Sequence, residues 1–326
     1  MTSPATVSVL IATLASSERA PYLLRALASL RCQGPVSVRP IVIVNGDSAD
    51  PALVRELERS PGITLLRRAE PSLPRALAAG CRSVDTEFFA QLDDDDELLP
   101  AALEVRLQRM TWPDRPDAVI TNGIVRNGAQ ERFSIPDAAA VERDPVAAML
   151  ERNWLLPGSA LFRAGTVGED VFAGTPPFLE WTYIGLLLAS RHRIALLPVP
   201  TVVHYEGHAF SMDRSRDCAL GRPLAFAAML QLDLPPAVKH RLRRKRGAAW
   251  HTASEVARLA GDPGAAWAAH LRSLTAPGGW RYATYTRYLL GLGRRRAALA
   301  QRREHALADQ PDGVRRVVVD AQRDLR

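Results

Sequence analysis

Short apolar runs alternate with helical patterns along the first 110 residues, and this alternation limits the fold more than any other feature. The apolar runs occupy residues 7–12, 40–44, 63–66 and 87–92. Apolar side chains at helical spacing lie between them, at residues 23–30, 51–59 and 73–83. Strands that alternate with helices form β-α-β units around a mostly parallel sheet. We therefore predict an α/β fold.

The pattern changes in the second half of the chain. Residues 113–218 mix short strands with loops rich in proline and glycine. From Pro223 onward the pattern is helical, with helices predicted at residues 238–246, 248–259, 264–274, 282–292 and 294–308. A length of 326 residues suits two domains. We predict an α/β domain at residues 1–220 and a basic α-helical domain at residues 221–326.

Charge is distributed unequally between these two parts. Residues 1–218 carry 22 basic and 27 acidic side chains, whereas residues 219–326 carry 20 basic and 8 acidic ones. The densest basic stretches are residues 240–246 and 294–296. They predict contact with an anionic surface, a membrane in particular, and solvated helix faces are the alternative. Nucleic-acid binding is not expected, because no known reader motif accompanies the charge.

The compartment is predicted from what the sequence lacks. No apolar run is long enough to span a bilayer, and the first strand follows no basic region typical of a secretory signal. The three cysteines are widely spaced and form no CxxC pair, which argues for a reducing compartment. We expect a cytoplasmic protein, peripheral at the membrane if the basic region binds lipid.

Four aspartates, Asp93 to Asp96, directly follow the apolar run at residues 87–92. Adjacent carboxylates repel one another, and a hard divalent cation with oxygen ligands relieves that repulsion. Alternate side chains of an extended segment share one side, so either Asp93 and Asp95 or Asp94 and Asp96 form a pair. A solvated acidic loop and an aspartate cap for a following helix are the alternatives. The position after a buried strand favours a metal site.

Polar residues also follow two other predicted strands. Thr13 follows the first strand, and Asn45 and Asp47 follow the second. In open α/β sheets, ligands bind beyond the carboxyl ends of the strands. We expect these loops and the aspartates to meet at one crevice.

Five segments together resemble family 2 glycosyltransferases. They are residues 7–13, 24–30, 41–50, 76–80 and 88–96. Their order and spacing match the first strand and helix, the second strand, and the approach to the metal-binding aspartates of that family. The resemblance extends from residue 7 to about residue 213. It implies the GT-A fold, a Rossmann-like architecture with a mostly parallel sheet.

The resemblance also implies a reaction. Family members transfer a sugar with inversion from a nucleotide-diphosphate donor to an acceptor hydroxyl, with Mg²⁺ or Mn²⁺. We expect a UDP-, dTDP- or GDP-linked donor, and a glycan, a lipid-linked molecule or a small molecule as acceptor. A nucleotidyltransferase is an alternative, although residues 13–17 lack the glycine-rich signature typical of that class. A non-catalytic protein that binds nucleotide sugars or membrane surfaces is another.

The family's donor site maps onto residues of this chain. By position, Thr13 lines the nucleotide base, and Asn45 stands where the family often has a base-reading aspartate. We assign Asp47 to the same nucleotide-sugar site. Asp93 corresponds to the ribose side and Asp95 to the metal, with Asp94 as the competing choice in this site. Asn45 departs from the family, as do Leu77 and Ala78, which replace a common Arg-Asn pair.

Glu180 is the predicted catalytic base. An inverting transfer needs a carboxylate to accept the proton of the acceptor hydroxyl, and a carboxylate beside an apolar wall accepts a proton more readily. Phe178, Leu179 and Trp181 supply apolar neighbours in the sequence. The family often places its base in an acidic pair before a tryptophan, a position that Glu180 resembles. A surface glutamate that begins a helix is the alternative.

Three further residues are candidates for the site. His204 and His208 lie in a stretch where some family members place a histidine near the metal or the diphosphate, and we favour His208 as the metal ligand. Trp154 is a candidate for stacking on a sugar, either of the nucleotide sugar or of the acceptor, and core packing is its alternative.

Overall fold

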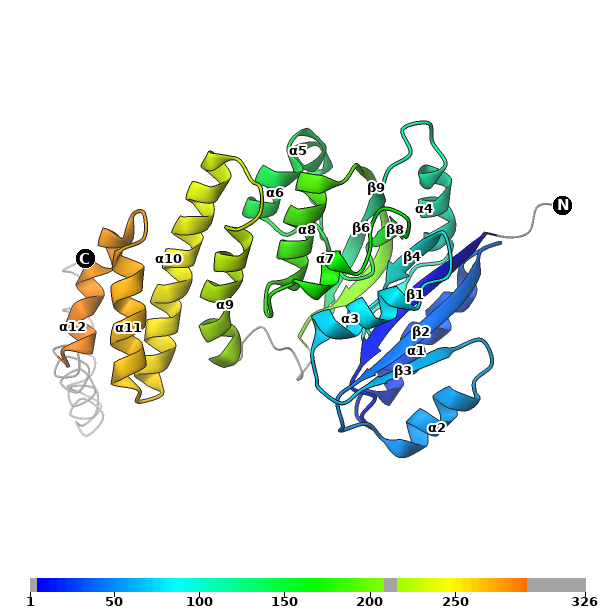
Figure 1. Cartoon of the computed structure of the whole chain (residues 1–326), viewed down its shortest axis with the longest axis horizontal. Helices are drawn as coiled ribbons and strands as arrows, with labels where there is room; N and C mark the ends of the chain where they lie inside the picture. The colour runs from blue at the N-terminus through cyan, green and yellow to red at the C-terminus, as the bar shows by residue number, and fades with distance from the viewer. Residues whose placement is uncertain (1–4, 208–215, 292–326) are drawn as a thin grey trace, which may run out of the picture. The chain divides into compact units, whose positions relative to one another are not determined.

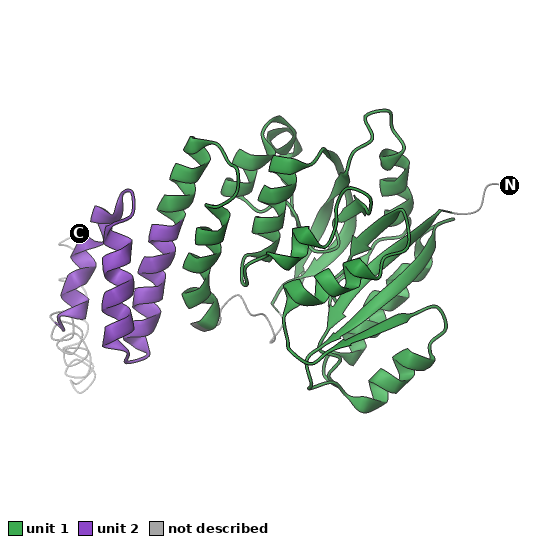
Figure 2. Cartoon of the chain, viewed as in Figure 1, with its two compact units in different colours: residues 1–245 green, residues 246–326 purple. Residues whose placement is uncertain are grey.

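The computed structural model describes residues 5–207 and 216–291 of the chain. The chain forms two compact units, residues 1–245 and 246–326 (Figure 2). The division lies inside the long helix α10 (Pro236–Leu259). The last described strand ends at Tyr205, and every later described element is helical, which confirms a C-terminal helical region. The boundary at residue 220 stays a prediction, because compactness and secondary structure divide the chain at different places.

Unit 1 is built on a nine-stranded sheet with the order β3-β2-β1-β4-β8-β6-β9-β5, in which β7 also pairs with β6 (Figure 1). The strands are β1 (Thr6–Thr13), β2 (Ser37–Asn45), β3 (Thr64–Arg68), β4 (Phe88–Gln91), β5 (Glu97–Leu98), β6 (Ala118–Asn127), β7 (Gln130–Phe133), β8 (Ala160–Arg163) and β9 (Ile194–Tyr205). The four predicted apolar runs correspond to β1 to β4, so the α/β fold is confirmed.

Most strands of the sheet point in one direction. β1, β2, β3 and β4 pair parallel to one another. β8 runs antiparallel to both β4 and β6, so β6 points the same way as β4. β9 pairs parallel with β6. The carboxyl ends of these six strands therefore lie at one edge of the sheet, where ligands bind in open α/β folds.

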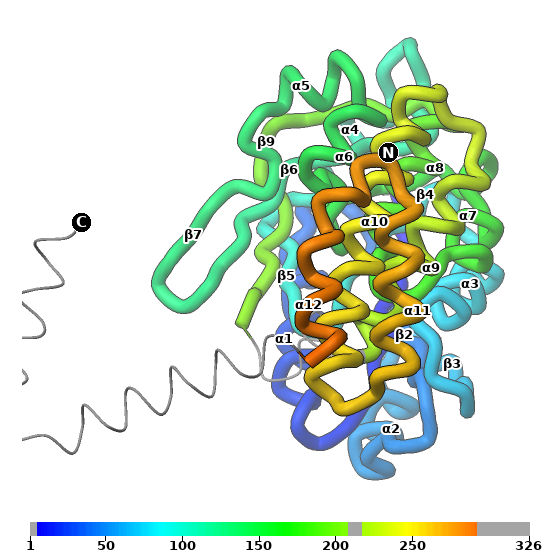
Figure 3. Tube along the Cα trace, turned by 90° about the vertical axis from the view of Figure 1, so that its left-hand side faces the viewer, coloured from blue at the N-terminus to red at the C-terminus, as the bar shows by residue number. Residues whose placement is uncertain are grey.

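Helices cover both faces of the sheet, which explains why its central strands read as nearly continuous apolar runs. One face packs against α1 (Ala20–Ser29), α2 (Pro51–Arg59) and α4 (Ala102–Met110). The other packs against α3 (Leu73–Arg82), α5 (Ala138–Arg143), α6 (Pro145–Glu151), α7 (Asp170–Ala173) and α8 (Glu180–Arg191). Along β1, Val9 and Ile11 face the first layer and Leu10 faces the second. The β6–β7 hairpin extends away from both layers (Figure 3).

The helical region differs from the sequence prediction in two places. After α9 (Arg216–Met229), the predicted helices at 238–246 and 248–259 form the single helix α10. One glycine inside a helix costs only about 1 kcal/mol relative to alanine, and Gly247 lies close to Ala276, which leaves no room for a side chain. The predicted helix at 282–292 is instead a 3₁₀ helix, Gly279–Tyr285, followed by the short α12 (Thr286–Leu289).

The remaining described helix of unit 2 is α11 (Pro263–Leu274). Its buried residues Ala266 and Ala269 lie in a unit that also buries Ala253 and Ala257 of α10. Small side chains allow helices to approach closely, so the core of this unit depends on alanine and glycine. The predicted helix at 294–308 lies outside the described residues. Within the described part of the chain, no helix combines the length and the apolar character needed to cross a membrane.

Candidate active site

Asp93 to Asp96 form a loop, called here the acidic loop, between β4 and β5. β4 ends at Gln91 and β5 begins at Glu97. β5 pairs antiparallel with β9, with Glu97 beside Val203. The acidic loop therefore lies between the carboxyl ends of β4 and β9, as expected for a ligand site.

Hydrogen bonds hold the two ends of the acidic loop. The carboxylate of Asp96 is fully buried, with Oδ2 2.9 Å from Nδ1 of His204, and its Oδ1 accepts from the backbone N–H of Tyr205 at 3.1 Å. Oδ1 of Asp93 accepts from Nε2 of Gln91 at 2.6 Å, and the other end of the Gln91 amide accepts from the N–H of Gly158. Both aspartates are thus fixed by strands of the sheet.

Burial and mutual repulsion disfavour the charged forms of carboxylates in the acidic loop. Burial raises the pKa of Asp93 well above its ordinary value, and the charges of Asp96 and Asp95 raise it further. Burial also raises the pKa of Asp96, against the hydrogen bond from His204. Burial alone would lower the pKa of His204, but the hydrogen bond to Asp96 and the nearby aspartates raise it to about 9. The loop is therefore an environment in which a cation is stabilised.

Two arginines that the sequence analysis did not single out also hold the acidic loop. Nε of Arg19 donates to Oδ2 of Asp94 at 2.9 Å, and Nη2 donates to Oδ1 of Asp94 and, at 3.2 Å, to Oδ2 of Asp95. The hydrogen bond to Asp94 is the main cause of a raised pKa for Arg19. Arg25 donates to the carbonyl oxygen of Asp95 at 2.6 Å and lies 3.1 Å from Glu97.

Arg25 also packs on Tyr205, with its guanidinium carbon 4.1 Å from the ring centroid. The Tyr205 hydroxyl donates to Glu97 at 2.5 Å. These partners lie 70 or more residues apart in the chain, so spacing in the sequence carries no sign of them.

Three carboxylates of the acidic loop are arranged to share one ion. Ligand oxygens of Asp93, Asp95 and Asp96 all lie within 4.8 Å of one another. Asp93 and Asp95 are one of the two pairs that the alternation of side chains allows, and Asp96, from the other pair, joins them because the loop turns toward β9. Asp94 is absent from this group and faces Arg19 instead.

The predicted nucleotide-site residues lie at the same edge of the sheet. Thr13 is buried at the end of β1, where its Oγ1 accepts from the N–H of Ala15, a residue with φ of 49°. Asn45 is buried at the end of β2, and its Oδ1 accepts from the N–H of Ser72 at 2.8 Å. Asp47 is exposed just beyond. The carboxyl ends of β1, β2 and β4 thus bring together the loops that were predicted to converge.

Glu180 is the first residue of α8, and α8 leads through a two-residue turn into β9. Because α8 runs back along the sheet against the direction of β9, its first turn lies at the edge where β9 ends. Leu179 and Trp181, on either side of Glu180 in the sequence, are partly buried and pack against the hydrophobic core. Phe178 precedes them with φ of 71°, a left-handed conformation that is unusual for a bulky residue.

Comparison with known proteins gives a family match over the part of the chain that contains the acidic loop. Residues 8–166 match the sequence profile of the family described as Glycosyl transferase family 2. The chain is a glycosyltransferase, and residues 8–166, just under half of it, carry the family 2 match. No curated protein matches it in sequence.

Solved structures of S. aureus TarS are similar to this glycosyltransferase in fold. TarS 1–349 in complex with UDP-GlcNAc has 13% sequence identity and a TM-score of 0.54, with 79% of this chain and 75% of that chain covered. TarS 1–349 in complex with UDP has 13% identity and a TM-score of 0.53, with 88% and 92% covered. At this identity the likeness shows the GT-A fold alone, and the fold prediction is confirmed.

Two of the predicted site residues are not placed at the candidate site of this glycosyltransferase. Trp154 lies in the hydrophobic core, and His208 is outside the described residues. Trp154 is 2% exposed in the hydrophobic core, where its Nε1–H donates to the carbonyl of Pro145 at 2.8 Å. A buried ring does not reach a sugar, so the stacking role predicted for Trp154 is replaced by its alternative, core packing. His208 lies outside the described residues, and its role as metal ligand stays a prediction. Of the two candidate histidines, His204 lies within the described residues, and it contacts Asp96.

The basic stretch at 240–246 forms about two turns of α10, with Arg243, Arg244 and Lys245 exposed and Arg241 paired with Glu151. Contact of this stretch with an anionic surface stays a prediction.

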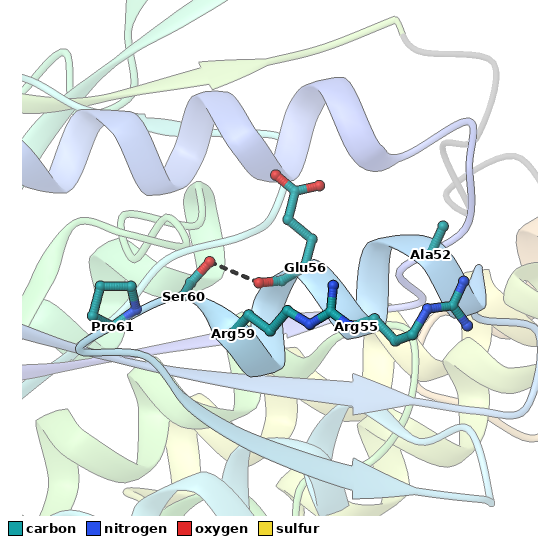
Figure 4. Close-up of a pocket in the computed structure, with 6 residues that line it drawn as sticks. All are labelled: Ala52, Arg55, Glu56, Arg59, Ser60 and Pro61. Carbon is teal, nitrogen blue, oxygen red and sulfur yellow. Dashed lines mark hydrogen bonds between the residues drawn. The ribbon is translucent and has the colours of Figure 1, made fainter.

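Two hollows in unit 1 are lined by residues that lie outside the acidic loop. One lies along α2, between Arg55, Arg59 and Pro61 (Figure 4). The other lies between β1, β2 and β3 at Ser8, Arg39 and Thr64. Neither holds the residues expected to bind a nucleotide sugar.

Proposed function

We propose that this glycosyltransferase transfers a sugar with inversion from a nucleotide-diphosphate donor to an acceptor hydroxyl, and that it depends on a divalent cation. The observation that carries the proposal is the group of Asp93, Asp95 and Asp96, whose ligand oxygens lie within 4.8 Å of one another at the carboxyl end of β4. The family match of residues 8–166 includes this loop.

The residues present fit Mg²⁺ or Mn²⁺. Carboxylate oxygens are the ligands that these hard cations prefer. Burial and mutual repulsion raise the pKa values of Asp93 and Asp96, so a positive charge placed among them relieves an existing strain. Asp95 is partly exposed, with 26% of its side chain open to solvent, so it can meet solvent or donor. A bound cation would neutralise the charge of the departing diphosphate.

The protein side chains supply proton transfer and positioning. In the proposed reaction Glu180 accepts the proton of the acceptor hydroxyl, and the hydroxyl oxygen forms a bond to the anomeric carbon of the donor sugar. The bond between that carbon and the diphosphate oxygen breaks, and its electron pair leaves with the nucleoside diphosphate. Leu179 and Trp181 limit water beside Glu180, which favours the acceptor over hydrolysis.

The donor base is proposed to be read near Asn45. Its Oδ1 is occupied by the N–H of Ser72, so the amide NH₂ is the part directed to a base. An NH₂ group donates, and it favours a base edge that presents an acceptor. A UDP-linked sugar is the first donor to test, because TarS was crystallised with UDP-GlcNAc and with UDP. Thermal-shift measurements with UDP, dTDP and GDP sugars, each with Mn²⁺, identify the donor.

Replacing Asp95 with alanine tests the proposed metal site. We expect slow release of nucleoside diphosphate from the donor by the wild-type chain with Mn²⁺, and a loss of about a hundredfold or more in Asp95→Ala. The expected reason is loss of a central ligand of the cation. Release is measured by a coupled assay for nucleoside diphosphate.

Asp85→Ala is the matched control, because Asp85 is exposed and pairs with Arg39 away from the acidic loop. It should retain wild-type activity. If Asp95→Ala is as active as Asp85→Ala, or if chelators leave the wild-type activity unchanged, the metal-dependent mechanism is wrong. Release of pyrophosphate in place of nucleoside diphosphate would support the nucleotidyltransferase alternative.

A further inference from the structure

Arg19 makes the most extensive contact with the acidic loop. It is the residue before α1, and its backbone is held by hydrogen bonds to Ser16 and from Tyr22 and Leu23. Its guanidinium meets both oxygens of Asp94, the fork-to-fork arrangement in which arginine binds a carboxylate most strongly. The side chains of Arg19 and Asp94 are 16% and 4% exposed, so little water screens the pair.

The contact of Arg19 with Asp95 is of a different kind. It is a single hydrogen bond of 3.2 Å from the same Nη2 that donates to Asp94. Asp95 is more open to solvent than Asp94, with 26% of its side chain exposed. Arg19 therefore holds Asp94 firmly and Asp95 weakly.

This difference matters because Asp95 has two possible cationic partners. One carboxylate oxygen of Asp95 belongs to the group with Asp93 and Asp96 that fits a divalent ion, and Oδ2 of Asp95 accepts from Arg19. Mg²⁺ binds carboxylate oxygens at about 2.0 to 2.1 Å, much closer than the arginine does. Arg25 fixes the main chain of Asp95 by its bond to the carbonyl oxygen, so only the side chain needs to change partner.

We propose that Arg19 is the internal counter-cation of the acidic loop, bound permanently to Asp94, and that it gives up Asp95 when a divalent cation binds. Arg19 is thus a positioning residue that acts through Asp94 and Asp95. Asp94 serves as its anchor and is not a metal ligand. This inference rests on the proposed function, because it assumes that the acidic loop binds a divalent cation.

The test measures Mn²⁺ binding to the metal-free full-length chain, without donor, by the loss of free Mn²⁺ signal in electron paramagnetic resonance. In Arg19→Met the competing hydrogen bond and a repelling charge are both removed. We expect Mn²⁺ to bind about tenfold more tightly, the equivalent of one charge-assisted hydrogen bond. The melting temperature of the metal-free variant should fall, and the rise produced by Mn²⁺ should exceed that of the wild type. A merely structural role would weaken Mn²⁺ binding instead.

Two further variants separate competition from simple charge and from misfolding. Arg25→Met removes a positive charge beside the same loop without freeing a side-chain oxygen of Asp95, and it should not tighten Mn²⁺ binding. Arg19→Lys keeps the charge and should bind Mn²⁺ within about threefold of the wild type. It remains informative if Arg19→Met does not fold.

The outcomes distinguish this inference from the proposed function. If the wild-type chain binds no Mn²⁺, the metal site itself is wrong. If the wild type binds Mn²⁺ but a folded Arg19→Met binds it equally or more weakly, only the role of Arg19 is overturned. Equal tightening in Arg25→Met also overturns it, because the effect would then be one of general charge.

Discussion

Arg106 of α4 is a fully buried arginine that connects this helix directly to β8 and β9. Its guanidinium donates to the carbonyl oxygens of Gly158 and Ala160 and, at 3.1 Å through Nε, to Oγ1 of Thr201. Thr201 in turn lies 2.5 Å from Thr121. Burial lowers the pKa of Arg106 to about 9, which still leaves it a cation at neutral pH. These bonds fix the strands behind the acidic loop.

At the scale of this residue, we predict that Arg106→Met destabilises the protein by about 3 kcal/mol, because buried carbonyl oxygens lose their donors. Urea unfolding followed by circular dichroism measures the change. Arg75→Met is the control, since Arg75 and its partner Glu70 are both mostly exposed, and it should change stability by less than about 1 kcal/mol. Equal unfolding midpoints for the two variants would contradict the prediction.

At the scale of elements, the start of α8 depends on α9. Phe178 has a left-handed backbone two residues before Glu180. Its ring lies against Gly221 of α9, where a Cβ would overlap the ring. Backbone strain of this kind persists only when neighbouring contacts hold it. The Phe178–Gly221 contact therefore sets the position of the proposed base.

We predict that Gly221→Ala displaces Phe178 and with it Glu180, and lowers kcat about tenfold while KM for the donor stays within about twofold. The proposed donor site lies at other strand ends, so donor binding should persist. Steady-state kinetics with the identified donor and acceptor measure both constants. Gly165→Ala is the control, because a Cβ at Gly165 meets open space. A KM increase with unchanged kcat would argue against this role for α9.

At the scale of the whole molecule, unit 2 has titratable groups in its core. His270 is buried, with Nε2 2.8 Å from Oγ1 of Thr286, and His251 stacks on Tyr282 with ring centroids 4.3 Å apart. Burial lowers the pKa of both histidines below 6.5, and the charge of His251 lowers that of His270 further. The unfolded chain therefore takes up these protons at a higher pH than the folded unit does.

The sign of the pH dependence follows from linkage. The contribution of these histidines to stability is present above pH 6.5 and is lost as the pH falls below 6.5 toward their lowered pKa values. We predict that His270→Gln, which cannot ionise there, shows a shallower loss of melting temperature between about pH 7.5 and pH 5. Scanning calorimetry across this range measures it. Parallel curves for the variant and the wild type would show that His270 does not contribute.

Much of the fold is determined by local pattern. The apolar runs that form β1, β2 and β4 are buried on both faces, so their own residues indicate their burial, whereas β3 is exposed or half-buried. The same pattern placed the acidic loop after β4, but it left open whether Asp93 and Asp95 or Asp94 and Asp96 form the pair on one side. Helix breaks were less predictable, because Gly247 is accommodated by its contact with Ala276 and not by neighbours in sequence.

The tertiary structure alone decided the partners of the acidic loop. The sequence by itself determined that four carboxylates end a buried strand, since that depends only on neighbouring residues. It could not determine that Asp94 pairs with Arg19, that Asp96 meets His204, or that Trp154 is core, because these contacts join segments that the sheet brings together from distant parts of the chain. Burial and long-range pairing set the charge of each group, and neither is a property of local sequence.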